Sequence, residues 1–267
     1  MDIATIKQRQ QAAWASGDYA AVGTRLLLTA ELLCEAVDLR AGERVLDVAC
    51  GHGNAALAAA RRFCQVTGVD YVPALLERAR QRAQAEGLEV TFQEGDAEDL
   101  PFGDASFDVV LSTCGAMFAP DQERTAQELL RVCRSGGKIG MANWPPSGLI
   151  GGGMFRIVTE HAPPPPGVQP STLWGTEDRL RELFGDGISE LELTHREFWF
   201  RYYSPEQWLE YFRTYFGPMV TAFERVGEDG AQALADDLLE LMRTGNTAGD
   251  AALVFPAEYV QVVAVRS

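Results

Sequence analysis

The chain has 267 residues, which fits one large domain or one domain with a sizeable insertion. Its formal net charge is -15, and because an acidic surface repels phosphate backbones, nucleic acid is not expected as a partner. Hydrophobic residues make up 46% of the chain, yet no apolar run approaches the roughly 20 residues that span a membrane. The polar N-terminus lacks the apolar core of a signal peptide, so the sequence predicts a cytoplasmic protein without membrane contact.

The cysteine and histidine content bears on the kind of site that is expected. The five cysteines are odd in number and include no C-x-x-C pair, which favours reduced thiols over a disulfide framework or a zinc site. The three histidines form no His-x-x-x-His pair, and no Asp/Asn cluster is present in the sequence. We therefore expect no metal in the site.

Residues 2–38 are expected to be helical. Residues 20–39 carry apolar side chains at spacings of three and four, the pattern of an amphipathic helix. Gly17 and Asp18 precede this stretch, where they can end one helix and cap the next. Helices are thus predicted before the first strand of the chain.

From residue 44 to residue 144, short apolar segments alternate with helical ones. The expected strands cover residues 44–50, 65–70, 89–96, 107–114 and 138–144. The expected helices between them cover residues 54–63, 72–87 and 122–137. This alternation indicates an α/β fold with a doubly wound parallel sheet.

The second half of the chain breaks this rhythm. Residues 145–180 are rich in glycine and proline and are expected to leave the sheet. The elements that follow are a strand, two helices and a final strand, over residues 190–203, 204–223, 229–245 and 257–267. Because strand and helix patterns resume on both sides of prolines 163–166, that run is a stiff loop within a single domain.

A glycine-rich loop lies between the first expected strand and its helix. Gly51, Gly53 and Ala56 form G-x-G-x-x-A, an accepted form of the dinucleotide-binding fingerprint. Asp70 ends the second expected strand 19 residues after Gly51 (70 minus 51), where a carboxylate can accept hydrogen bonds from ribose hydroxyls. An NAD(P)-dependent oxidoreductase is therefore one function that this loop supports.

Three other features favour a different cofactor. Asp47 lies inside the end of the first strand, where a carboxylate would repel a pyrophosphate but suits an ammonium or sulfonium group, or simply caps the glycine turn. Asp96 and Ala97 follow the third strand, where a carboxylate can accept from an exocyclic amine and a backbone N–H can donate to a ring nitrogen. No second mononucleotide-binding half follows the fifth strand.

Five segments carry a family resemblance: VLDVACGHGNAAL, VTGVDYVPALLERAR, EGDAEDLPF, FDVVLSTCGAMFAPD and ELLRVCRSGGKIGMANW. Over residues 44–144 they resemble the successive motifs of class I S-adenosylmethionine-dependent methyltransferases, in the style of the small-molecule branch with the ubiquinone and menaquinone C-methyltransferases. The resemblance implies a Rossmann-like seven-stranded sheet, mostly parallel with an antiparallel final strand. It also implies an N-terminal helical lid (1–40), a cofactor-binding core (41–145), and a helical cap region that shapes the acceptor pocket (146–250).

The resemblance assigns S-adenosylmethionine as the cofactor and gives individual residues a role. Asp47, Gly51 and Gly53 match the loop around the methionine part, and Asp70 matches the acid that binds both ribose hydroxyls. The other expected cofactor-binding residues lie beside the adenine, the methionine moiety and the cofactor carboxylate: Tyr71, Asp96, Ala97, Cys114 and Tyr19, with Trp14 as a further lid candidate. Tyr71 also fits ordinary packing at a helix start. His52 is expected to hold its ring in solvent.

Methyl transfer from a sulfonium is an in-line displacement that leaves neutral S-adenosylhomocysteine, so the protein mainly aligns the reactants and excludes water. No catalytic residue is identified, and His161 and His195 are the candidates for a base. The aromatic-rich residues 144–216 predict a small apolar or aromatic acceptor, methylated on O, N or C, in a pocket formed by Phe118, Trp144, Phe155 and Trp174. A non-catalytic S-adenosylmethionine-binding protein is a further alternative. The oligomeric state is open, with a homodimer as one option.

Overall fold

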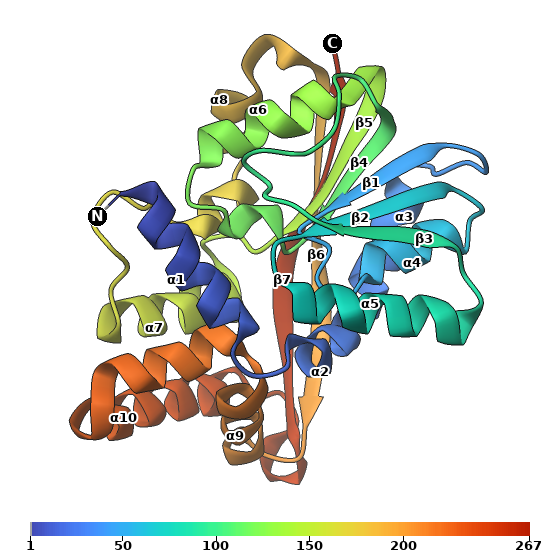
Figure 1. Ribbon diagram of the computed structural model, residues 1–267. Helices are drawn as coiled ribbons and strands as arrows, with labels where there is room; N and C mark the ends of the chain where they lie inside the picture. The colour runs from blue at the N-terminus through green and yellow to red at the C-terminus, as the bar shows by residue number, and fades with distance from the viewer. Residues whose placement is uncertain (1) are drawn as a thin grey trace.

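The computed structural model describes residues 2–267 and contains a seven-stranded sheet with helices on both faces (Figure 1). In chain order the strands are β1 (Arg44–Val48), β2 (Gln65–Asp70), β3 (Val90–Glu94), β4 (Phe107–Thr113), β5 (Cys133–Asn143), β6 (Ile188–Tyr202) and β7 (Leu253–Arg266). Their order across the sheet is β3-β2-β1-β4-β5-β7-β6. Strands β1 to β5 pair in parallel, whereas β7 pairs antiparallel with both β5 and β6. The predicted Rossmann-like sheet is confirmed.

The helices surround this sheet and extend beyond it. They are α1 (Ile3–Ala15), α2 (Tyr19–Gly23), α3 (Leu27–Ala36), α4 (Asn54–Ala60), α5 (Pro73–Glu86), α6 (Gln122–Val132), α7 (Arg156–His161), α8 (Glu177–Phe184), α9 (Pro205–Tyr215) and α10 (Gly217–Gly245). Short 3-10 turns cover Thr24–Leu26, Ala116–Phe118, Ser171–Gly175, Gly185–Gly187 and Gly249–Ala251, and a π-helical turn covers Gly148–Phe155. No helix within residues 2–267 is long and apolar enough to cross a membrane.

The loops that follow the parallel strands lie together at one edge of the sheet. The five parallel strands all end at this edge, and the strand order reverses between β1 and β4. In open α/β sheets this switch point is where ligands bind. In Figure 1, α1 (dark blue) lies beside this edge, between the sheet and the helices α7 and α10.

The helices next to the switch point have clear sequence determinants. Helix α4 is buried along its whole length, and its short alanine side chains allow close packing between α3 and the sheet. Helix α5 begins at Pro73, a residue suited to the first helical position because it needs no N–H partner there. It ends at Gly87, whose φ of 65° gives the left-handed C-cap that glycine favours.

The start of β5 differs from the prediction. The sequence suggested helix up to residue 137, but the strand begins at Cys133. Cys133 pairs with Phe107 of β4, and an irregularity separates this pair from the regular ladder that resumes at Val109 and Lys138. The pairing with β4 therefore determines the strand start, and the intervening glycines do not end the preceding helix.

The C-terminal helices also divide differently. The predicted helix over residues 204–223 is interrupted at Phe216, because Pro218 has no backbone N–H to continue the helical hydrogen bonding. Helix α10 contains a second break at Gly227, whose φ of 65° and ψ of -173° are not helical. Strands β6 and β7 run past the rest of the sheet toward α9 and α10 (Figure 1).

Two clusters of buried hydrophobic residues make up the core. The smaller cluster lies beneath α3, α4 and α5. The larger one continues from sheet residues such as Leu46 and Val110 into the helices α9 and α10, through Trp208 and Leu238. The C-terminal helices are thus packed onto the sheet through one continuous core. The division into lid, core and cap at residues 40 and 145 stays a prediction.

Candidate functional site

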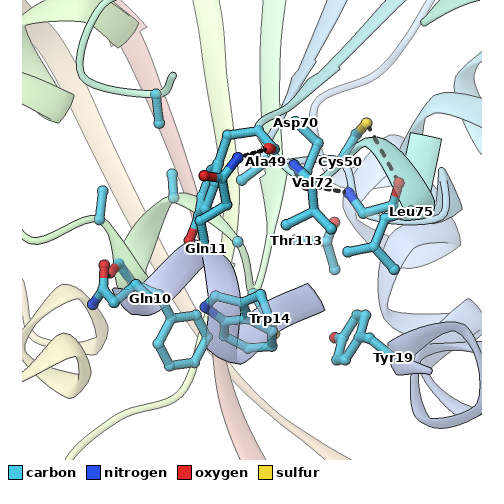
Figure 2. A pocket seen from close by; sticks show the side chains of 18 of the residues that line it. Gln10, Gln11, Trp14, Tyr19, Ala49, Cys50, Asp70, Val72, Leu75 and Thr113 are labelled. Atoms are coloured by element: carbon cyan, nitrogen blue, oxygen red, sulfur yellow. Dashed lines mark hydrogen bonds between the residues drawn. The ribbon is translucent and has the colours of Figure 1, made fainter. Parts of the chain in front are cut away.

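A cavity of about 300 Å³ opens where β1, β2, β3 and β4 end, and α1 and α2 contribute to its walls. The strand and loop residues in its wall are Asp47, Ala49, Cys50, Gly51, Asp70, Tyr71, Asp96, Ala97, Thr113 and Cys114. Figure 2 shows Gln10, Gln11 and Trp14 projecting from α1 toward these loops, with Tyr19 approaching from α2. The cavity brings together every predicted cofactor-binding residue except Gly53.

The two glycines of the loop have different surroundings. Gly51 and Gly53 both adopt positive φ, 54° and 87°. A Cβ atom on Gly53 would lie 3.2 Å from side-chain atoms of both Ala79 and Phe92, so glycine here lets the loop pack on α5 and β3. A Cβ atom on Gly51 would meet only the Tyr19 ring, 3.7 Å away. Gly51 therefore faces the cavity and leaves its backbone open to a ligand.

The loops after β1 and β4 touch each other at the switch point. Ala49 and Cys114 both have a φ of 52°, a left-handed conformation that residues other than glycine rarely adopt. A Cβ atom on Gly115 would lie 2.4 Å from the Ala49 carbonyl oxygen, so the two loops are in backbone contact. Such strained residues cluster at functional sites; the family resemblance indicated Cys114, whereas nothing in the sequence indicated Ala49.

Two buried carboxylates hold the glycine loop. Asp70 accepts the N–H groups of Gly51 (Oδ2, 2.8 Å) and Val72 (Oδ1, 2.8 Å). Asp47 Oδ2 accepts the N–H of Ala56 at 2.8 Å, so the cap role that the sequence left open is present. Burial outweighs these hydrogen bonds and raises the pKa of Asp47 to about 7 and that of Asp70 to about 6.

The charge of the cavity wall suits a cation. Asp47 and Asp70 are 1% and 6% exposed, and both keep unused acceptor positions, because a carboxylate has about four of them. Among the described residues that line the cavity, Lys7 is the only lysine or arginine, and it is paired with Asp96 and Glu98. A positively charged ligand beside Asp47 or Asp70 would therefore stabilise their ionised forms.

The other end of the cavity lies at the ends of β2 and β3. Asp96 Oδ1 accepts the N–H of Glu98 at 2.9 Å, and Asp96 Oδ2 accepts a hydrogen bond from Lys7. Gln11 Nε2 donates to the Tyr71 carbonyl oxygen. Lys7 and Gln11 are candidates that sequence reasoning missed, because the weakly amphipathic pattern of α1 does not indicate which loops it contacts.

A second, apolar cavity adjoins the first. It measures about 30 Å³ and is lined by Trp14, Tyr19, Val22, Leu26, Cys114, Phe118, Trp144, Ile150, Met154, Phe155, Phe200, Phe212 and Phe216. Five of these also line the first cavity: Trp14, Tyr19, Leu26, Cys114 and Phe118. The Trp14 ring packs 5.5 Å from Tyr19 and 5.1 Å from Phe118, so an aromatic wall separates the two spaces.

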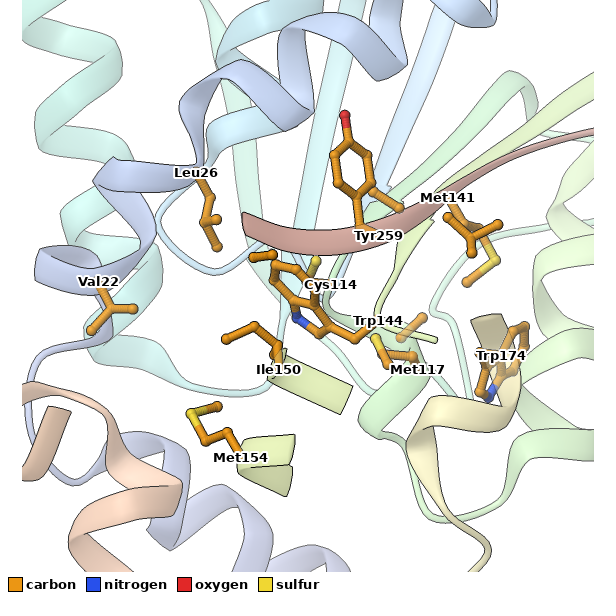
Figure 3. Packing of buried hydrophobic residues seen from close by; sticks show 14 of the residues in the cluster. Val22, Leu26, Cys114, Met117, Met141, Trp144, Ile150, Met154, Trp174 and Tyr259 are labelled. Carbon is orange, nitrogen blue, oxygen red and sulfur yellow. The ribbon is translucent and has the colours of Figure 1, made fainter. Parts of the chain in front are cut away.

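Three of the four predicted acceptor-pocket residues lie at the apolar cavity, and one does not. Phe118, Trp144 and Phe155 line it. Trp174 is fully buried elsewhere: its ring packs on Phe184, and its carbonyl accepts the side-chain N–H of Asn143. Figure 3 shows Trp144 beside Cys114 and Ile150, with Trp174 apart from them. The prediction for Trp174 is wrong because its side chain packs between β5 and α8.

The histidine predictions are also corrected. His161 Nε2 lies 2.7 Å from Asp237 Oδ2 on α10, and His195 is exposed on β6, so neither lines either cavity. His52 does line the first cavity, and its ring is buried, not in solvent. A Cβ atom on Gly23 would lie 2.2 Å from His52 Cε1, because α2 packs over this ring. Burial lowers the pKa of His52 to about 3, which keeps the imidazole neutral.

Comparisons with known proteins agree with this geometry. A family profile described as a methyltransferase domain matches residues 46–141. The chain is 40% identical over 234 residues to an uncharacterized protein of Mycobacterium tuberculosis, covering 86% of this chain and 85% of the relative. It is 42% identical over 125 residues to the demethylmenaquinone methyltransferase of Deinococcus radiodurans, covering 45% of this chain and 52% of that enzyme. The crystal structure of the Bacillus subtilis YcgJ protein shares the fold, with a TM-score of 0.63, 20% identity, and coverage of 89% and 97%.

The profile spans the strand-end residues that build the first cavity, from Asp47 through Asp70 to Asp96. The seven strands and the antiparallel pairing of β7 match the sheet that the family resemblance implied. On these grounds the chain belongs to the class I S-adenosylmethionine-dependent methyltransferases.

Proposed function

We propose that this enzyme binds S-adenosylmethionine in the first cavity and transfers its methyl group to a small apolar or aromatic acceptor at the second, which at about 30 Å³ must widen to hold it. The observation that carries the proposal is the shared wall. Trp14, Tyr19 and Cys114 border both the carboxylate-lined cavity and the apolar one. An in-line displacement requires the acceptor atom to contact the methyl carbon directly, so these side chains would move aside and join the two spaces when the acceptor binds.

The cofactor roles follow from the positions of the carboxylates. Asp70, at the end of β2, would accept from the ribose hydroxyls with its unused acceptor positions, while its bonds to Gly51 and Val72 keep it in place. Asp47 would attract the cofactor's positively charged end across the glycine loop. Bound there, S-adenosylmethionine supplies an electrophilic methyl group on a sulfonium. Burial raises the pKa values of both acids, and a bound cation would lower them again by stabilising the carboxylates.

The apolar cavity supplies desolvation and alignment without acid–base groups. Its titratable side chains, among the described residues, are Tyr19 and Cys114. Burial raises the pKa of Tyr19 well above its ordinary value and that of Cys114 to about 12, so both stay protonated at neutral pH. The acceptor must therefore arrive with an atom that is nucleophilic by itself, such as an ionised phenol or enol or a neutral amine.

The test is a ligand and acceptor panel. Isothermal titration of the purified protein should show binding of S-adenosylhomocysteine and no binding of NAD or NADP at the same concentrations. Turnover of S-adenosylmethionine should then occur with apolar phenols, enols or amines and be absent with phosphorylated or zwitterionic acceptors. Binding of NAD without binding of S-adenosylhomocysteine would contradict the proposed cofactor. Cofactor binding without turnover on any acceptor would instead favour a non-catalytic binding protein.

A further inference from the structure

Lys7 of α1 occupies an unusual position, because it reaches from the N-terminal helix into the cavity wall at the ends of β2 and β3. Its ammonium group contacts Asp96 Oδ2 and Glu98 Oε2, both at 2.5 Å. The side chain of Lys7 is 29% exposed and that of Glu98 only 4%. The inference drawn from this cluster rests on the proposed function, since it concerns the adenine end of the cofactor.

The position of Asp96 is fixed by its neighbours. Its Oδ1 accepts the N–H of Glu98 at 2.9 Å, and its own carbonyl accepts the N–H of Asp99 at 3.0 Å. The adjacent residue, Ala97, is buried and lines the same cavity. With Lys7 on Oδ2 as well, the carboxylate retains about two acceptor positions for a ligand.

The charge balance of this cluster depends on Lys7. Partial burial acts to lower the pKa of Lys7, but its hydrogen bonds to Asp96 and Glu98 outweigh this, and the pKa is raised above its ordinary value. Glu98 also accepts the N–H of Asp121 at 2.8 Å, which joins the loop after β3 to the loop after β4. Without the ammonium, the carboxylates of Asp96 and Glu98 would repel each other, and Asp96 Oδ2 would lose the contact that fixes it.

We propose that Lys7 is a positioning residue for purine recognition: it fixes the Asp96 carboxylate as a hydrogen-bond acceptor toward the exocyclic amine of the cofactor's adenine. An ionised carboxylate accepts hydrogen bonds but has no proton to donate. It therefore favours a 6-aminopurine, which presents N–H groups, over a 6-oxopurine, which presents an oxygen. Because Lys7 belongs to α1, purine selection would depend on a residue of the N-terminal helix as well as on the strand ends.

Other contacts keep α1 in place when Lys7 is replaced. Gln10 Nε2 donates to the Phe118 carbonyl at 3.2 Å, and Gln11 donates to the Tyr71 carbonyl. Trp14 adds aromatic packing against Phe118. A variant at Lys7 is therefore expected to fold and to keep α1 docked, so that its binding properties report on Asp96.

The experiment measures ligand preference. Wild type, Lys7→Gln, Lys7→Arg and the remote control Lys138→Gln are titrated calorimetrically with S-adenosylhomocysteine and with its 6-oxo analogue S-inosylhomocysteine. Wild type and Lys138→Gln should prefer the adenine compound by at least about 10-fold, the scale of one hydrogen bond to a charged group. Lys7→Gln should bind the adenine compound about 10-fold more weakly while the analogue changes little. Lys7→Arg should restore the preference, and in an Asp96→Asn background Lys7→Gln should add almost nothing.

The outcomes separate this inference from the proposed function. Equal weakening of both ligands in Lys7→Gln would make Lys7 a clamp for α1 only and overturn the inference. An unchanged preference in that variant would overturn it as well, while binding by the wild type would leave the proposed function standing. Failure of the wild type to bind either compound would overturn both. Melting curves of each variant confirm that the fold persists.

Discussion

The cofactor cavity and the apolar cavity share a wall, but they are built in different ways. Most of the wall of the first cavity comes from the loops that follow strands β1 to β4. Its shape depends on backbone groups, glycines and two buried carboxylates. The second collects side chains from α1, α2, β6, α9 and the turns around Trp144 and Met154. The first therefore reflects a chemistry shared by a family, whereas the second can change residue by residue without disturbing the sheet.

The largest effect is expected when Asp70 is removed from the first cavity, because this tests whether that cavity binds the cofactor. Asp70→Ala deletes the expected ribose acceptor and the support of the Gly51 N–H. We expect the affinity for S-adenosylhomocysteine to fall at least about 100-fold in calorimetric titration, because two hydrogen bonds to a charged group are lost. Asp104→Ala is the matched control, since Asp104 forms an exposed ion pair with Arg131. Unchanged affinity in Asp70→Ala would remove Asp70 from the ribose role.

The second prediction changes Phe155, which lines only the apolar cavity. Phe155→Ala enlarges the space beside Phe118 and Met154 and removes an apolar contact for the acceptor. With an acceptor identified from the panel, KM for that acceptor should rise about 10-fold, the scale of one lost apolar contact. The affinity for S-adenosylhomocysteine should change less than about twofold, because Phe155 does not line the first cavity. Phe63→Ala, at an exposed turn, serves as control.

A large drop in cofactor affinity for Phe155→Ala, with acceptor KM unchanged, would mean that the two cavities are not divided as proposed. Steady-state kinetics together with calorimetry on the same preparation distinguish the two results.

A third prediction concerns stability and pH. The pKa of Asp47 is about 7 in the folded protein, above its ordinary value of 3.8, so the fold favours the protonated acid. Its contribution to stability is therefore greatest below about pH 4 and declines as pH rises through about 7, and the buried charge is fully formed only above that pH. Asp47→Asn should remove this decline and raise the melting temperature at pH 8 by about 3 °C, while weakening cofactor binding.

Asp47→Asn can keep the hydrogen bond to Ala56 through its amide oxygen, which isolates the effect of charge. Thermal unfolding of both proteins between pH 5 and pH 8 provides the measurement. A lower melting temperature for the variant at every pH would show that the carboxylate stabilises the empty protein.

The smallest effects are expected at the two histidines outside both cavities. His161→Ala loses a surface contact with Asp237, and His195→Ala changes an exposed position on the outer strand. Each should alter turnover less than about twofold, since exposed polar contacts of this kind contribute about 1 kcal/mol or less. A 10-fold loss of kcat in either variant would place a proton-transfer step outside the cavities described above.

The sequence predicted those parts of the fold and site that depend on local patterns. Short Val-rich segments between helices are typical of parallel strands, and Asp47, Gly51 and Asp70 occupy strand-end positions that the order of segments alone determines. Side-chain direction in the C-terminal half could not be predicted in this way. Trp174 and Trp144 are both aromatic residues after β5, and only the packing of the turn that contains Trp174 against α8 separates their roles.

Contacts between distant segments account for the other differences. His52 lies under α2 because Gly23, which has no side chain, leaves room for the imidazole, a match between positions 29 residues apart (52 minus 23). Lys7 reaches Asp96 across an even longer separation. Such pairings depend on how α1 and α2 dock onto the sheet, and no periodicity within either helix specifies this.

The wall formed by Trp14 and Tyr19 has a further consequence for how the methyl acceptor can be found. Because both side chains touch both spaces, occupying one space changes the surroundings of the other, and the two binding equilibria are thermodynamically linked. Linkage is reciprocal. If a compound in the apolar space changes the affinity for S-adenosylhomocysteine by some factor, then bound S-adenosylhomocysteine changes the affinity for that compound by the same factor. A library can therefore be screened against the product-bound enzyme by equilibrium measurement alone, before any methylated compound has been detected.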